Sequence, residues 1–121
     1  MIQIASRSIL TVPQIRTAQP VTTVFSADGM ETAAFRRLDD VLRGQTVTFI
    51  KMDIEGAEPL ALHGAEQIIR MQTPKLAICT YHKAEHLWEI PAMILQLNPA
   101  YKIYFRHHDK DEMETVCYAV S

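Results

Sequence analysis

The chain has 121 residues, of which 48% are hydrophobic and 21% are charged, and its formal net charge is −2. This length allows one domain with a single core, and the composition is typical of a soluble globular protein. The weak negative charge gives no electrostatic basis for binding nucleic acid or a membrane surface. No apolar run reaches the ~18 residues that a membrane span requires. The first 27 residues, with Arg7 and Arg16 but no acid, faintly resemble a transit peptide but suit strands better, so a cytoplasmic protein is the default expectation.

The two cysteines, Cys79 and Cys117, both lie within apolar runs and do not have the spacing of a metal or redox motif. This placement favours buried free thiols in a reducing compartment. A disulfide between them is the alternative interpretation.

The first 38 residues are irregular but rich in β-branched residues. We expect short strands at residues 20–26 and 34–38, separated by a turn at Asp28-Gly29. Asp39 or Asp40 could then cap a short helical turn that Gly44 closes.

Residues 47–53 form the clearest strand, apolar on both faces as in a buried parallel strand. Gly56 follows in a turn, and Pro59 suits the first turn of a helix. Apolar residues then recur at helical spacing as far as Ile69. Gly64, within this helix, permits a close approach of the helix to the sheet.

Residues 75–80 predict a second buried strand, and residues 87–97 a helix that could restart at Pro91 and that ends at Asn98-Pro99. Residues 101–108 and 114–120 flank a polar loop and predict an antiparallel hairpin. This order of elements indicates an α/β sheet with a partly antiparallel edge.

Two of the expected strand ends are polar, and ligands collect beyond the carboxyl ends of parallel strands. Asp53 and Glu55 cluster beside a glycine turn at the first of these ends, which favours a site over a structural salt bridge. Lys51 lies in an otherwise apolar strand and needs an acidic partner there. Glu58 is explained by the helix dipole alone. His82, at the second strand end, could be a base, a ligand or a structural residue.

A metal site is not predicted, because three possible ligands at unproven distances are weak grounds for one. A hydrolase that holds a divalent metal on Asp53, Glu55 and His82 remains an alternative. His107 and His108 are neighbours on a strand and point to opposite faces, so they make a poor metal pair.

Several segments occur in the order seen in one known family: "RLDDVL", "FIKMDIEGAE", "ALHGA", "PKLAICTYH", "YKIYFRHH" and "ETVCYAV". Between about residues 37 and 120 the chain resembles the FkbM-type S-adenosylmethionine-dependent methyltransferases. The K-x-D-x-E-G-A-E segment is the most specific part of this match.

The resemblance implies a Rossmann-like class I methyltransferase sheet, mostly parallel with a C-terminal antiparallel hairpin. It implies S-adenosylmethionine as cofactor and O-methylation of a small-molecule or sugar hydroxyl. Asp53, Glu55 and His82 would be the catalytic residues, and Asp53 and Lys51 would contact the cofactor. The acceptor would be a small molecule or a glycan.

The glycine-rich loop that holds the cofactor in this family has no counterpart among the four glycines of the chain. We therefore expect residues 1–121 to form a single, N-terminally truncated methyltransferase domain that lacks the N-terminal βα units. A non-catalytic remnant of such a domain is the alternative. Without those units the strand at 47–53 would expose an unpaired edge, so we also expect poor cofactor binding and a homo-oligomer formed through that edge.

Overall fold

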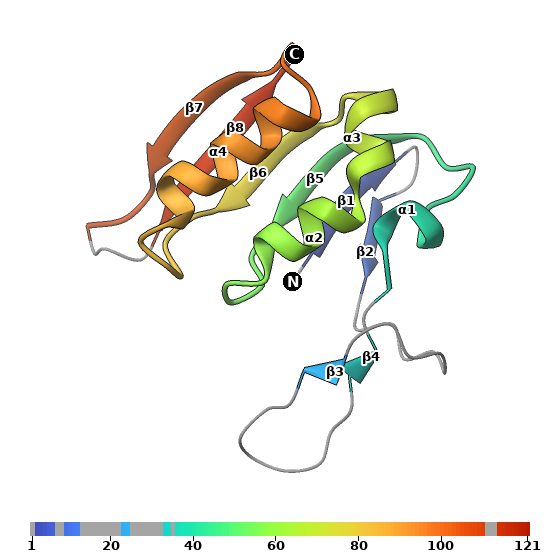
Figure 1. The fold of residues 1–121 in the computed structure, drawn as a ribbon, viewed down its shortest axis with the longest axis horizontal. Coiled ribbons are helices and arrows are strands. Elements are labelled where there is room, and N and C mark those ends of the chain that lie inside the picture. Colours follow the sequence, from blue (N-terminus) through green and yellow to red (C-terminus); the bar gives the residue numbers. More distant parts are fainter. Residues whose placement is uncertain (1, 7–8, 13–22, 25–32, 35, 111–113) are drawn as a thin grey trace.

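The computed structural model describes residues 2–6, 9–12, 23–24, 33–34, 36–110 and 114–121. Figure 1 shows the helices lying across one face of the main sheet. The strands are β1 Ile2–Ser6, β2 Ile9–Val12, β3 Thr23–Val24, β4 Ala33–Ala34, β5 Val47–Met52, β6 Lys75–Cys79, β7 Lys102–His107 and β8 Thr115–Val120. The helices are α1 Leu38–Val41, α2 Glu58–Gly64, α3 Glu66–Gln72 and α4 His86–Leu97.

The main sheet has six strands in the order β2-β1-β5-β6-β8-β7. Among the described strand pairs of this sheet, β5 and β6 are parallel and the other pairs are antiparallel. The fold is therefore mixed α/β, and the expectation of a mostly parallel sheet is wrong for the described residues. The reason is local: β1–β2 and β7–β8 are hairpins, whereas the β5-to-β6 connection contains two helices and can return parallel. The predicted C-terminal hairpin is confirmed.

The expected free edge of β5 does not exist, because β1 pairs with β5 along its whole length. The edge strands of the six-stranded sheet are β2 and β7. The homo-oligomer that we expected through an exposed β5 edge therefore loses its structural basis. Of the strand expected at residues 20–26 the structure describes β3, which pairs with β4 in a separate two-stranded sheet; the other residues of that segment, and the turn expected at Asp28-Gly29, lie outside the described residues.

The core lies between the sheet and its helices, and it fixes β5 and β6 from one side. Ile50 and Met52 of β5 are fully buried in it, while Phe49 packs with a small second cluster. The largest fully buried apolar side chains of this core are Ile50, Met52, Leu62, Ile69, Leu76, Ile78, Ile90 and Ile94. Burial on this scale holds the ends of β5 and β6 in a fixed register.

Three helical details differ from expectation. The helix expected after Pro59 is divided at Ala65 into α2 and α3, and α4 runs through Pro91 without a break. A Cβ on Gly64 would lie 3.4 Å from the Cα of Arg37, so this glycine permits close approach to the segment before α1 rather than to the sheet. None of the described helices is long and apolar enough to cross a membrane.

Candidate functional site

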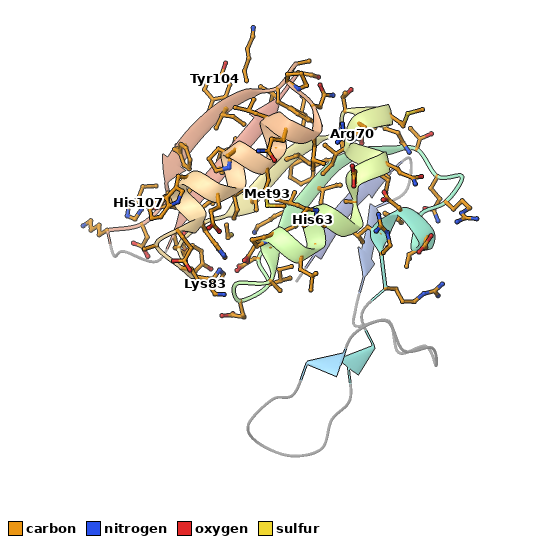
Figure 2. The ribbon with its side chains drawn as sticks, in the orientation of Figure 1. His63, Arg70, Lys83, Met93, Tyr104 and His107 are labelled. Atoms are coloured by element: carbon orange, nitrogen blue, oxygen red, sulfur yellow. The ribbon has the colours of Figure 1, made fainter. Side chains whose placement is uncertain are left out.

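The parallel pairing of β5 with β6 brings two polar loops to one edge of the sheet. Met52 is in register with Ile78, so the residues after each strand emerge side by side. We call residues 53–58 and 80–86 the carboxyl edge. Lys83, which Figure 2 labels, belongs to this edge. The prediction that Asp53 and His82 share an edge is confirmed, because His82 Nε2 lies 3.5 Å from Asp53 Oδ1.

His82 stands between acidic side chains on both sides of its ring. Nε2 is 3.3 Å from Glu55 Oε2 as well as 3.5 Å from Asp53, and Nδ1 is 3.2 Å from Glu58 Oε1. The side chain of His82 is only 10% exposed, whereas that of Glu55 is 90% exposed. The imidazole is therefore held inside the edge and faces two acids that reach solvent.

Glu58 is the most deeply buried charged group of the carboxyl edge, with a fully buried side chain. Its Oε1 accepts the backbone N–H of Ile54 at 2.9 Å, and its Oε2 lies 3.7 Å from His86 Nδ1. Glu58 begins α2, as a helix-dipole acid would, but that explanation is incomplete. Because this fully buried carboxylate lies beside two histidine rings, we interpret Glu58 as part of the site and not only as a helix-dipole residue.

Three buried atoms at this edge have no hydrogen-bond partner in the described structure: Glu58 Oε2, His82 Nδ1 and His86 Nδ1. Buried polar atoms are nearly always hydrogen-bonded, so a group of such atoms needs an explanation. The carboxyl edge holds these polar groups close together, but three of their buried atoms have no hydrogen bond. Functional sites tolerate this arrangement, whereas structural polar clusters generally do not.

The turn after β5 has a left-handed backbone at two successive residues. Glu55 has φ 56° and Gly56 has φ 95°. Glycine suits the second position because other residues rarely adopt this φ; a Cβ there would also lie 3.2 Å from Cε of the flexible Lys83 side chain. A glutamate with positive φ is uncommon and stores strain, which is frequent at functional sites.

Tyr81 adds a proton donor that the sequence analysis did not identify. Its hydroxyl donates to Asp53 Oδ1 at 3.0 Å. Burial first, and then this hydrogen bond to Asp53, raise the pKa of Tyr81 well above its usual range. Burial and the charge of Asp53 likewise raise the pKa of Cys79 to about 11. Both groups therefore stay protonated near neutral pH.

Lys51 does not form the predicted ion pair with Asp53 or Glu55 in the part of the chain that the structure describes. It lies beside Gln3 and Ala77 in the register of the sheet and is half-buried. Its charge lowers the pKa of Cys79, although burial and Asp53 outweigh this effect. Lys51 thus shares a face with the site without binding its acids.

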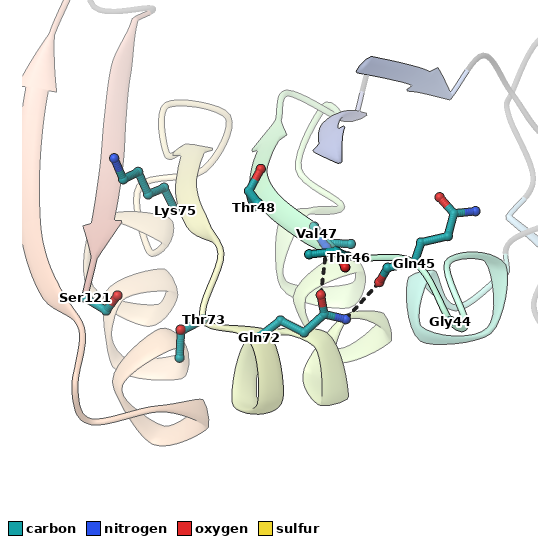
Figure 3. Close-up of a pocket in the computed structure, with 9 residues that line it drawn as sticks. All are labelled: Gly44, Gln45, Thr46, Val47, Thr48, Gln72, Thr73, Lys75 and Ser121. Carbon is teal, nitrogen blue, oxygen red and sulfur yellow. Dashed lines mark hydrogen bonds between the residues drawn. The ribbon is translucent and has the colours of Figure 1, made fainter. Parts of the chain in front are cut away.

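The opposite ends of β5 and β6 border a shallow groove of about 520 Å³. Figure 3 shows Gln72 bridging its floor, where Oε1 accepts the Val47 N–H at 2.7 Å and Nε2 donates to the Gln45 carbonyl at 3.1 Å. We call this end the amino edge. Its lining residues are Gly44, Gln45, Thr46, Val47, Thr48, Gln72, Thr73, Lys75 and Ser121.

Glu58 and His86 were also missed as members of the carboxyl edge. Glu58 is three residues after Glu55, and the turn between them, which has two positive φ values, places both acids beside one imidazole. His86 is on the buried face of α4, where the sequence pattern suggested an apolar Leu87; Leu87 is in fact 45% exposed. A helical pattern read one residue out of phase hid this histidine.

Comparison with known proteins identifies the family. The family described as "Methyltransferase FkbM domain" matches residues 12–111, a longer N-terminal and a shorter C-terminal extent than we expected. The structure of "Methyltransferase FkbM" from Methylobacillus flagellatus KT is similar, with 42% sequence identity and a TM-score of 0.69. This match covers 73% of the chain and 23% of that protein, so the chain spans about a quarter of its length. No curated protein matches. The chain belongs to the FkbM methyltransferase family.

Proposed function

We propose that the carboxyl edge is the acceptor side of a methyltransferase site that methylates a hydroxyl group of a small molecule or sugar. The observation that carries this proposal is the convergence of Asp53, Glu55 and His82 at the ends of two parallel strands. S-adenosylmethionine supplies an activated methyl group in this chemistry. The protein then has to orient the acceptor and take its proton.

The residues of the edge have the chemistry for these two tasks. Nε2 of His82 and the carboxylates of Asp53 and Glu55 can each accept the proton of an acceptor hydroxyl. Tyr81, whose pKa is raised, keeps its proton and donates to Asp53. That hydrogen bond orients the carboxylate of Asp53 toward the position that the acceptor would occupy.

The described residues do not fit the whole cofactor. The strand beside β5 is β1, which runs antiparallel, so the described chain has no strand–glycine loop–helix unit at that position to hold a nucleoside. We therefore propose that this chain contributes the acceptor side of a larger methyltransferase site, in a reducing cytoplasmic compartment that its two free thiols favour.

The antiparallel pairing of β1 with β5 also favours a second candidate, a non-catalytic member of the family. In that case β1 replaces the cofactor-binding unit, and the carboxyl edge keeps its acids without turnover. The two candidates differ in one measurable property, which is transfer of a methyl group from S-adenosylmethionine.

A chimaera separates the two candidates. The matching part of this chain replaces the corresponding segment of the Methylobacillus flagellatus protein, and labelled S-adenosylmethionine is supplied with a panel of hydroxyl acceptors. We expect labelled product, and a loss of about 100-fold with Asp53→Asn, while the unfolding free energy changes little. A chimaera that binds the cofactor but transfers no methyl group would favour the non-catalytic candidate.

A further inference from the structure

Three carboxylates lie around the imidazole of His82. Asp53 and Glu55 face one nitrogen of its ring and Glu58 faces the other. Lys51 makes no ion pair with these acids in the described structure, and Lys83 approaches the turn at Gly56 with its side-chain carbons. Carboxylates this close together repel one another, and a cation bound between them would lower that repulsion.

The position of the single N–H on a neutral imidazole decides which of its nitrogens can bind a cation. A neutral ring has one N–H, and Glu58, whose side chain is fully buried, is the acid beside Nδ1. A proton on Nδ1 therefore leaves the lone pair of Nε2 facing Asp53 and Glu55. Histidines that bind metals have this arrangement, with the second nitrogen turned toward a carboxylate.

The distances at Nε2 fit ligands of one metal ion better than hydrogen bonds. Nε2 is 3.3 Å from Glu55 and 3.5 Å from Asp53, and Nδ1 of the nine-tenths-buried ring has no hydrogen-bond partner among the described residues. Donor atoms about 2.1 Å from a tetrahedral cation lie about 3.4 Å from each other. One atom each from Asp53, Glu55 and His82 lies within 4.8 Å of the other two, so a small closure of the carboxylates completes the set.

We propose that Asp53, Glu55 and His82 bind one divalent cation, and that Glu58 positions His82 for this task. Two carboxylates and one imidazole suit Mn²⁺ or Zn²⁺ better than Ca²⁺, which prefers a set made only of oxygens. The remaining coordination positions face solvent, because Glu55 is 90% exposed and Asp53 is 37% exposed.

The cation would have a clear use in the proposed reaction. A hydroxyl oxygen bound to it loses its proton more easily and is held in a fixed position. This consequence depends on the proposed function, whereas the binding itself does not.

The test is a titration of the metal-free chain with Mn²⁺ and, separately, with Zn²⁺, in the absence of cofactor and acceptor. We expect one bound ion per chain. Glu55→Gln should weaken binding about 10-fold or more, and because Glu55 is exposed this variant should fold normally. Glu58→Gln should weaken binding by about 10- to 100-fold. Glu89→Gln, which alters an exposed acid on α4, should leave the affinity unchanged.

The position of the ion is measured by paramagnetic broadening of amide signals by Mn²⁺. Broadening centred on Gly56 and Lys83 supports the site. Broadening centred on His107 and His108, equal affinity of Glu55→Gln and the parent, or no binding at millimolar metal would each overturn the proposal. None of these results depends on whether the protein transfers a methyl group.

Discussion

The two ends of β5 and β6 are both polar, but they use polar groups in opposite ways. At the amino edge Gln72 satisfies the Val47 N–H and the Gln45 carbonyl, and both Oε1 and Nε2 of its amide have a partner. At the carboxyl edge Glu58 and His82 are more deeply buried, and yet each keeps an unsatisfied atom. A polar cluster that only joins elements satisfies its hydrogen bonds, whereas one assembled for chemistry leaves groups free to bind.

The largest expected change in stability comes from Glu58→Ala. Its loss leaves the Ile54 N–H without its acceptor and removes the acid facing His82 and His86. We expect the free energy of unfolding to fall by about 3 kcal/mol, measured by urea denaturation. Glu66→Ala is the control, because the partly exposed Glu66–Arg70 pair contributes only about 0.3–0.5 kcal/mol. Equal effects of the two variants would show that Glu58 is not integral to the edge.

A smaller loss is expected from Gln72→Ala at the amino edge. This variant removes both hydrogen bonds of the bridge and leaves the Val47 N–H, in a residue that is 1% exposed, without its partner. We expect a cost of about 1–2 kcal/mol in urea denaturation, with metal affinity unchanged. Gln45→Ala, which keeps the backbone carbonyl, should cost much less. A change in metal affinity with Gln72→Ala would break the distinction between the two edges.

The smallest expected changes in stability come from relieving backbone strain, which occurs at both the carboxyl edge and the amino edge. Each edge has one non-glycine residue with positive φ, Glu55 at 56° and Thr73 at 46°. Glycine relieves this strain, so Glu55→Gly and Thr73→Gly should each raise the free energy of unfolding by about 1 kcal/mol. Only Glu55→Gly should also weaken metal binding. If it stabilised the fold and left metal binding intact, the strain at Glu55 would have no link to the site.

Much of the carboxyl edge was predictable from the sequence, because it depends on strong local patterns. The apolar strands at 47–53 and 75–80, with a helical segment between them, require a crossover that brings Asp53 and His82 to one edge. The ion-pair distances at His82 confirm that placement. The terminal hairpin follows from the same kind of pattern.

The parts that could not be predicted depend on contacts distant in sequence or on the backbone of a turn. Nothing local in residues 2–6 shows that β1 pairs with β5 rather than leaving that edge free. The role of Glu58 depends on the left-handed turn at Glu55 and Gly56, and its partner His86 comes from another helix. The ion pair expected for Lys51 failed for a similar reason, because alternation places a residue on a face without fixing its contacts.

The central claim is that the carboxyl edge carries function and the amino edge carries structure. The rate of methyl transfer by the chimaera, compared between Asp53→Asn and Gln72→Ala, tests it most directly. We predict that Asp53→Asn lowers the rate by about 100-fold with little change in stability, while Gln72→Ala lowers stability and changes the rate less than about 2-fold. Equal rates for the two variants, or a rate that follows stability alone, would contradict the account.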